Sequence, residues 1–275
     1  MPILISPREL HDLVEAGEAP VVLDVRWRLD QPDGRPAYLQ GHLPGAVYVD
    51  LGTELSRHGR PDEGRHPLPD IEDLGRSARR WGIDDGDTVV VYDDLNSLSA
   101  ARAWWLLRWA GVEDVRILDG ALAAWRAEYP VESGEVAPVA GGIRLSAGHL
   151  PTVDADGAAA WPGSGVLLDA RAAGRFTGEI EPIDPRAGHI PGAVSAPTTE
   201  NVDADGRFLE AEALRSRFAR MGVEQGTAVA VYCGSGVTAA HQTAALTIAG
   251  FDPVLYPGSW SQWSNEPGRP VARGG

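Results

Sequence analysis

Lysine is absent from this chain of 275 residues, so all 24 basic side chains are arginines. The absence removes the primary amine that some enzymes use as a catalytic group. Only one cysteine is present, Cys233, so no disulfide can form within the chain. No apolar run reaches the roughly 18 residues that a transmembrane helix needs. These absences exclude an internal disulfide framework and predict a protein without a membrane span.

Positive charge is also scarce, and the formal net charge is −15. Because nucleic acids and anionic membranes bind to basic surfaces, we expect neither as a general partner. The first residues, MPILISPREL, lack the basic and apolar regions of a signal peptide. We therefore expect a soluble, cytoplasmic protein. Its apolar share of 43% is ordinary for a globular protein with a core.

The chain repeats itself, since five features recur in the same order at offsets of 138 to 147 residues. The pairs are VVLDVR (21–26) with VLLDAR (166–171), GHLPGAV (41–47) with GHIPGAV (188–194), GIDDGDTVVVYDD (82–94) with GVEQGTAVAVYCG (222–234), AGVEDVRILDG (110–120) with AGFDPVLYPGS (249–259), and Trp125 with Trp263. This pattern indicates a tandem duplication. We assign residues 1–132 to an N-terminal domain and 152–275 to a C-terminal domain. Residues 133–151, rich in Gly, Pro and Ala, are the expected linker.

Each copy alternates short apolar runs with helical patterns. Ser6 and Glu9 form a predicted capping box at the start of the first helix. The helical run AARAWWLLRWAG ends at Gly111. Uninterrupted apolar strands alternating with helices predict a parallel sheet that is covered on both faces. The expected fold is therefore α/β, with a central parallel sheet of about five strands in each copy.

Cys233 lies where a strand-like run, 228–232, meets a helical run, 237–249. In parallel α/β sheets, ligands bind at the carboxyl ends of strands, against helix N-termini. Gly234 and Gly236 let the loop turn N–H groups inward, and those groups favour an anion at the sulfur. The alternative is a buried, inert cysteine. The strand–Cys–Gly-x-Gly–helix arrangement favours a thiolate nucleophile instead.

Several motifs carry a resemblance to a known family: the paired turns GHLPGA and GHIPGA, the loop YCGSGVTA, and the segments DGALAAW and PGSWSQW. On these, the chain resembles the tandem rhodanese sulfurtransferases over essentially its full length. The resemblance implies two rhodanese-like domains and a Cys233 that cycles between thiolate and persulfide. A small sulfur donor would load it, and a thiol acceptor such as thioredoxin, or cyanide, would unload it. Backbone N–H groups of Gly234, Gly236, Val237 and Thr238 would hold the sulfur anion.

Asp93 occupies in the first copy the position that Cys233 occupies in the second. A carboxylate cannot carry sulfane sulfur, so we expect the N-terminal domain to be catalytically silent. Its loop, DDLNSLSA, has no glycine, and we expect it not to turn N–H groups onto residue 93. A phosphatase of related fold would carry Arg six residues after the cysteine. Ala239 stands there, which argues against that class.

The residues after Cys233 bear on the donor. Thiosulfate-preferring relatives resemble each other in carrying Arg and Lys there, whereas Gly234 and Ser235 offer only neutral dipoles. The CGSGVT form resembles 3-mercaptopyruvate sulfurtransferases, whose loop serine is placed in a proton relay. We expect a 3-mercaptopyruvate sulfurtransferase, with a thiosulfate:cyanide sulfurtransferase as the alternative. A non-catalytic persulfide carrier or binding module is a further alternative.

The resemblance assigns more residues to the site. His66, in RHPLP, and Asp50 would complete the relay, although Gly52 stands where the family has a second acidic residue. Arg175, in GRFTGE, and Arg186, in DPRAGH, would clamp the carboxylate of the donor. For either arginine, the alternative is a solvated salt bridge.

Trp260 would cover the sulfur or pack in the core. The pairs Asp24–Arg26 and Asp169–Arg171 recur in both copies, which favours a scaffold ion pair over catalysis. His42 and His189 recur in the same way and are expected to stabilise turns. One cysteine and scattered histidines give no metal-ligand spacing, and no organic cofactor motif is present, so we expect neither a metal nor a cofactor.

Overall fold

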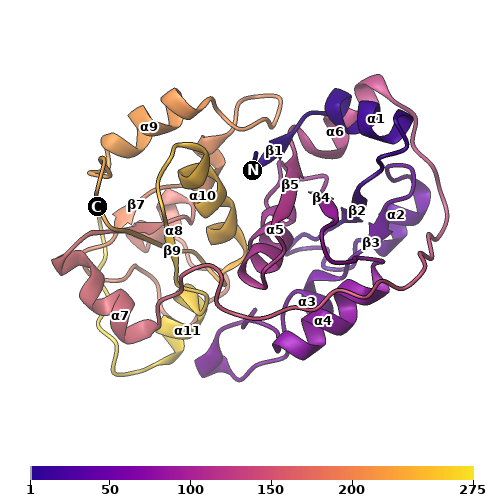
Figure 1. Ribbon diagram of the computed structural model, residues 1–275. Helices are drawn as coiled ribbons and strands as arrows, with labels where there is room; N and C mark the ends of the chain where they lie inside the picture. The colour runs from indigo at the N-terminus through magenta and orange to yellow at the C-terminus, as the bar shows by residue number, and fades with distance from the viewer. Residues whose placement is uncertain (1) are drawn as a thin grey trace. The chain divides into compact units, whose positions relative to one another are not determined.

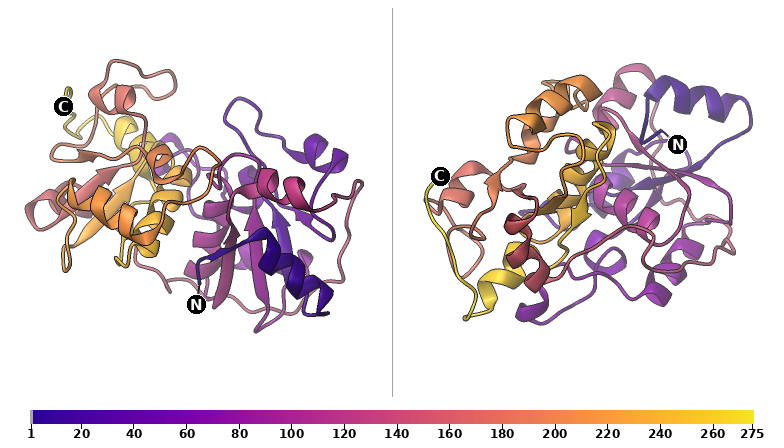
Figure 2. Two further views of the ribbon diagram at one scale, coloured as in Figure 1. Left: turned by 90° about the horizontal axis from the view of Figure 1, so that it is seen from above. Right: turned by 60° about the vertical axis from the view of Figure 1, so that its left-hand side comes forward.

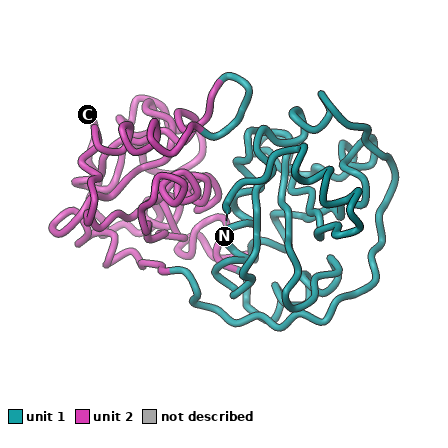
Figure 3. Tube along the Cα trace, turned by 45° about the horizontal axis from the view of Figure 1, so that its top comes forward, with its two compact units in different colours: residues 1–57, 69–150, 204–208 teal, residues 58–68, 151–203, 209–275 magenta. Residues whose placement is uncertain are grey.

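The computed structural model describes residues 2–275, which divide into two compact units (Figure 3). Unit 1 contains residues up to 57 with 69–150 and 204–208, and unit 2 contains 58–68, 151–203 and 209–275. Each half of the sequence therefore lends a short segment to the other unit. The division predicted from sequence, at 1–132, 133–151 and 152–275, contains neither exchange, because segment packing is not visible in composition.

Unit 1 is built on a parallel sheet with the strand order β1-β5-β4-β2-β3 (Figure 1). Its strands are β1 (Leu4–Ile5), β2 (Val21–Asp24), β3 (Val47–Tyr48), β4 (Thr88–Tyr92) and β5 (Asp114–Leu118). Its helices are α1 (Pro7–Glu15), α2 (Arg35–Gln40), α3 (Leu51–Glu54), α4 (Ile71–Arg80), α5 (Ala100–Trp109) and α6 (Ala121–Glu128). The capping box of Ser6 and Glu9 is confirmed, and α5 ends just before Gly111, which has a φ of 97°.

Unit 2 repeats this plan with the strand order β7-β6-β8-β9, also parallel. Its strands are β6 (Val166–Asp169), β7 (Val194–Ser195), β8 (Val229–Tyr232) and β9 (Val254–Leu255). Its helices are η1 (Pro61–Glu63), α7 (Ala155–Ala160), η2 (Trp161–Gly163), α8 (Ala173–Thr177), η3 (Thr198–Asn201), α9 (Ala211–Ala219), α10 (Val237–Ile248) and α11 (Ser259–Asn265). Within residues 2–275 this sheet has four strands, because the counterpart of β1 is a single bridge from Thr152 to Leu255.

Both faces of each sheet are covered, as the uninterrupted apolar strands predict. In unit 1, Val90 and Tyr92 of β4 pack in one cluster with Leu10 of α1 and Trp125 of α6. Alternate residues of the same strand point to the opposite face, where α5 packs. In unit 2, α7 and α11 cover one face and α10 the other, and Figure 2 shows the helices on both sides.

The repeated Asp-Arg pairs are confirmed as scaffold. Arg26 grips the Asp24 carboxylate through Nε and Nη2, and its Nη2 also donates to Gly41 O. Arg171 grips Asp169 with the same edge and donates to Gly188 O. These bonds tie the end of a central strand to the turn that follows it, which satisfies buried charge with fixed partners.

The repeated histidines also stabilise turns. The Nδ1 of His42 lies 2.9 Å from Leu43 O, and the ring stacks on Tyr38. The Nδ1 of His189 lies 2.8 Å from Phe176 O, and the ring stacks on Phe176. Across residues 2–275, no helix combines the length and the apolar character needed to cross a lipid bilayer.

Candidate active site

Cys233 follows β8 at the carboxyl end of the sheet, where the sequence places it. The thiol is buried, with the residue 1% exposed, and the N–H of Gly236 donates to Sγ at 3.1 Å. Gly236 adopts a φ of 81°, which aims its N–H back at the sulfur and begins α10 at Val237. Thr238 occupies the second position of that helix. The loop therefore offers the sulfur a backbone donor at the start of a helix, which favours an anion.

The first turn of α11 holds the loop in place. Its Trp260 and Ser261 donate their N–H groups to Cys233 O at 2.9 Å and Gly234 O at 2.8 Å. Ser259 adopts a φ of 54°, and its Oγ accepts the N–H of Cys233 at 3.1 Å. A non-glycine residue at positive φ carries strain, so the local packing imposes this conformation. The PGSWS segment, 257–261, thus holds the backbone at Cys233 and Gly234.

His66 reaches the loop from the segment 58–68, which belongs to unit 2. Its Nδ1 lies 2.8 Å from the Oγ of Ser235, two residues after Cys233. The hydroxyl can donate to an imidazole nitrogen or accept from it, depending on the tautomer. The structure therefore brings together three of the predicted residues: Cys233, Ser235 and His66.

Two guanidinium groups lie against Gly234. A Cβ placed on this glycine would be 3.2 Å from Nη2 of Arg65 and 3.3 Å from Nη1 of Arg175. Arg175 was predicted at the site, whereas Arg65 was not. Gly234 and Ser235 themselves carry no charge, but cationic groups from two other segments reach the residue after Cys233.

These guanidinium groups share buried carboxylates. Asp184 accepts bonds from Nη1 of Arg65 and, at 2.8 Å, from Nη2 of Arg175. Glu181 accepts from Nη2 of Arg175 at 2.7 Å. Both carboxylates are almost fully buried. The Arg171 guanidinium, paired with Asp169, also lies 3.4 Å from Glu181. Because three cations face three anions, the cluster holds its arginines in fixed geometry without net charge.

Arg186 and Trp260 have structural roles here. The Arg186 guanidinium donates to four backbone carbonyls at the C-terminal end of α11, those of Trp263, Ser264, Glu266 and Arg269. Trp260 is fully buried in the core of unit 2, and its Nε1 donates to Arg186 O at 3.0 Å. The Arg171 guanidinium lies 4.6 Å from the centre of a Trp260 ring. The core alternative for Trp260 and a capping role for Arg186 account for these contacts.

Asp50 has a local role in unit 1. It is the N-cap of α3, where its Oδ1 accepts the N–H of Thr53 at 3.1 Å and its own N–H donates to Glu54. Gly52 lies within the same turn. A part for Asp50 in the proton relay stays a prediction.

The Asp93 loop in unit 1 contradicts one expectation. The carboxylate accepts four N–H bonds of 2.8–3.0 Å, from Leu95, Ser97, Ser99 and Ala100. Asn96 and Ser97 take φ values of 54° and 64°, so they provide the left-handed turn for which the sequence analysis expects glycine. Burial raises the pKa of the Asp93 carboxyl, and the four N–H bonds oppose that rise. This loop does form an N–H cradle, with a built-in anion inside it.

Sequence reasoning missed Arg65 and Ser259. Arg65 directly precedes His66, and the pair Gly64-Arg65 recurs as Gly206-Arg207, which is the signal that could have drawn attention to it. The positive φ of Ser259 recurs at Ala121, at 55°, but a backbone angle leaves no mark in a sequence of ordinary residues.

Comparisons with known proteins agree on one family. The rhodanese-like domain matches residues 6–128 and 154–266 of the chain. A Mycobacterium tuberculosis protein, SseB, provisionally named a thiosulfate sulfurtransferase, is 50% identical over 278 residues, which cover 99% of this chain and 97% of SseB. The 3-mercaptopyruvate sulfurtransferase of Escherichia coli K12 is 38% identical over 240 residues, covering 85% of this chain and 84% of its own.

A solved structure shares the whole fold. The crystal structure of SseA from Escherichia coli, described among the 3-mercaptopyruvate sulfotransferases, aligns with a TM-score of 0.84. The alignment has 34% sequence identity and covers 94% of this chain and 99% of that one.

Proposed function

Because this chain belongs to the rhodanese family of sulfurtransferases, we propose that it takes sulfane sulfur from 3-mercaptopyruvate onto Cys233 and passes it to a thiol acceptor. One observation carries the choice of donor. The Oγ of Ser235 lies 2.8 Å from Nδ1 of His66, two residues after the nucleophile. Such a pair can deliver a proton, which this donor needs and thiosulfate does not.

The proposed first half-reaction balances without a cofactor. The Cys233 thiolate attacks the donor sulfur, a new S–S bond forms, and the S–C bond of the donor breaks. The electron pair of that bond stays on carbon as the enolate of pyruvate. Ser235, backed by His66, supplies a proton to that carbon, and the donor's own thiol proton restores the relay. The products are pyruvate and a Cys233 persulfide anion next to the N–H of Gly236.

In the second half-reaction, an acceptor thiolate or cyanide attacks the outer sulfur of the persulfide. The S–S bond breaks and its electron pair returns to the Cys233 thiolate. Thioredoxin and cyanide are the acceptors that we propose to test. A persulfide carrier without turnover would complete the first step but not repeat it.

Thiosulfate is the second candidate donor, and two observations favour it. The relative from Mycobacterium tuberculosis carries that substrate in its provisional name. The guanidinium groups of Arg65 and Arg175 lie at Gly234, where they could meet a dianion without Arg or Lys in the loop itself. Thiosulfate releases sulfite, which needs no proton on carbon, so the two donors depend differently on Ser235.

The test is a comparison of kcat/KM for both donors in the wild type and in Ser235→Ala. We expect a higher value for 3-mercaptopyruvate in the wild type. The variant should lose about 10²- to 10⁴-fold with that donor, the usual contribution of a positioned acid, and much less with thiosulfate. Cys233→Ser is the control: it should lose both activities and fail to gain about 32 Da, one sulfur, after donor treatment. Equal or better use of thiosulfate by the wild type would overturn the choice of donor.

A further inference from the structure

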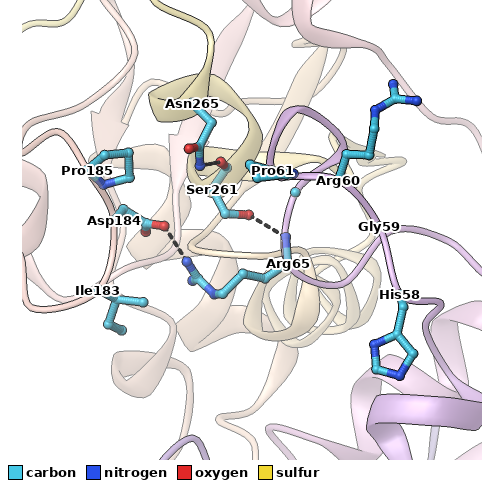
Figure 4. A pocket seen from close by; sticks show the side chains of 11 residues that line it. His58, Gly59, Arg60, Pro61, Arg65, Ile183, Asp184, Pro185, Ser261 and Asn265 are labelled. Atoms are coloured by element: carbon cyan, nitrogen blue, oxygen red, sulfur yellow. Dashed lines mark hydrogen bonds and ion pairs between the residues drawn. The ribbon is translucent and has the colours of Figure 1, made fainter.

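Arg65 stands beside the residue that follows the nucleophile. It comes from the segment 58–68, and its Nη2 lies 3.2 Å from where a Cβ of Gly234 would be. In Figure 4 its side chain extends toward Asp184 at the wall of a cavity of about 530 Å³. The same segment brings His66 to Ser235. Arg65 and His66 therefore face Gly234 and Ser235, two successive residues of the loop 233–236, which we call the nucleophile loop.

The Arg65 guanidinium uses only part of its donor capacity. Its Nη1 holds Asp184. Its Nε is buried and, among residues 2–275, has no hydrogen-bond partner. Nε and Nη2 form the side edge of the guanidinium fork, the edge with which Arg26 and Arg171 grip carboxylates in this protein. On the corresponding edge of Arg65, Nη2 lies beside Gly234, and neither nitrogen has a carboxylate partner among the described residues.

The Arg65 guanidinium is not needed to hold the segment 58–68 in place. The backbone N–H of Arg65 already donates to Ser261 Oγ at 3.0 Å (Figure 4). Gly64, at a φ of 88°, approaches Gly258 O so closely that an added Cβ would lie 2.7 Å from it. Asp184 keeps a second partner in Arg175. The segment and the carboxylate are thus both held by bonds that do not need the Arg65 guanidinium.

We propose that Arg65 binds the carboxylate of the sulfur donor through its Nε–Nη2 edge, opposite Arg175. This inference rests on the proposed function and names the second guanidinium of its donor site, a role that Arg186 cannot fill while it holds four carbonyls. Asp184 accepts a hydrogen bond from the guanidinium of Arg65 and from that of Arg175, and so fixes the orientation of both. A 2-oxo acid would then lie with its carboxylate between the two arginines and its sulfur toward Cys233.

The experiment compares the donor acid with its methyl ester, which lacks the negative charge. In Arg65→Ala, KM for 3-mercaptopyruvate should rise about 10- to 100-fold, the fold-change expected for a lost charged hydrogen bond. The kcat/KM for the methyl ester should stay the same. Arg65→Lys keeps the charge but not the fork, so its KM should fall between those of the wild type and Arg65→Ala. Parallel loss of acid and ester activity, or an unchanged KM for the acid, would refute the role.

A matched variant separates binding from anchoring. Asp184→Asn breaks the same ion pair but keeps the guanidinium, so it should retain the preference for the acid over the ester. If Arg65 only anchored the segment through Asp184, both variants would damage acid and ester use alike.

A binding measurement decides the inference without turnover. Calorimetric titration with pyruvate, the carboxylate product, should give a Kd about 10- to 100-fold weaker in Arg65→Ala, with methyl pyruvate unaffected. If the wild type prefers thiosulfate but pyruvate binding still depends on Arg65, the donor assignment fails, and Arg65 is shown to bind a carboxylate that is not that of the sulfur donor. If pyruvate binding is the same in both proteins, or absent from the wild type, the inference fails, whichever donor is used.

Discussion

Gly234 directly follows Cys233, and the space for a side chain there is already occupied. An added Cβ would lie 3.2 and 3.3 Å from guanidinium nitrogens of Arg65 and Arg175, closer than most such contacts allow. Both neighbours are the far ends of flexible side chains, so they can move by a few tenths of an ångström at small cost in stability. We therefore expect a side chain at this position to weaken donor binding rather than to lower the stability of the fold.

We therefore predict that Gly234→Ala raises KM for the anionic donor several-fold while the free energy of unfolding changes by less than about 1 kcal/mol. Steady-state kinetics and urea unfolding provide the two measurements. Gly268→Ala is the matched control, because no atom lies within 4 Å of its added Cβ. An unchanged KM in Gly234→Ala would mean that the guanidinium groups do not contact the donor.

The two predicted arginines show how far single residues could be assigned from sequence. Arg175, which follows a strand of the same unit and belongs to a specific motif, lies beside Gly234, and its binding of the donor carboxylate stays a prediction. Arg186 lies in a similar stretch but caps a helix end. Arg65 lies 169 positions before Gly234, and no local pattern reports a contact over that distance. Guanidinium donors suit carboxylates and carbonyls alike, so residue type alone could not separate these roles.

The loops that follow β4 and β8 both direct backbone N–H groups at the side chain that follows the strand, but that side chain differs between the two units. In unit 2 the N–H of Gly236 points at a thiol, and in unit 1 four N–H groups point at the Asp93 carboxylate. The carboxylate thus satisfies donors at the start of α5 that would otherwise be buried without partners. A carboxylate takes, in unit 1, the place that the Cys233 sulfur takes in unit 2.

Asp93→Asn should destabilise the protein by at least about 2 kcal/mol, because the amide nitrogen would face two backbone donors that now bond to an oxygen. The expected result is a lower urea midpoint with unchanged KM for the donor. Asp94→Asn is the control: its side chain forms a partly exposed ion pair with Arg28, worth about 0–1 kcal/mol. Equal stability of the two variants would show that the carboxylate is not needed to hold the loop.

Secondary structure followed closely from the sequence, since the β4 and β8 runs and the helices after them were predicted from periodicity. The repeat also placed Asp93 and Cys233 at equivalent strand ends. The conformation of the first loop was not predictable, because Asn96 and Ser97 adopt left-handed angles that composition rules assign to glycine. Four converging hydrogen bonds offset that local cost, and such compensation depends on the folded loop rather than on propensity.

Tyrosines are the main groups whose ionisation should change the stability of the molecule at alkaline pH. Burial raises the pKa of five of them, and that of Tyr48 reaches about 12. The five are Tyr38, Tyr48, Tyr92, Tyr232 and Tyr256. With no lysine in the chain and arginines that stay charged, few other groups titrate in this range. Tyrosine ionisation can therefore be read with little interference.

The free energy of unfolding should be independent of these tyrosines below about pH 10 and fall as the pH rises above it. Above that pH the unfolded chain releases phenolic protons that the folded protein retains, so deprotonation favours unfolding. Each group adds a slope of up to about 1.4 kcal/mol per pH unit. Urea unfolding across this range, with tyrosinate absorbance as a second signal, measures the effect. Tyr48→Phe should reduce the slope by one group, and a flat profile above about pH 10 would contradict the burial argument.

The exchange of short segments between the two units also has a consequence for synthesis. Residues 58–68 leave the ribosome early, but the nucleophile loop and the α11 turn that they contact are made about 170 to 200 residues later. At about 5–20 residues per second, the segment waits on the order of ten seconds or more for its partners. Unit 1 in turn lacks residues 204–208 until most of the chain exists. The nascent chain therefore cannot finish one domain and then begin the next, and completion of both depends on its last third.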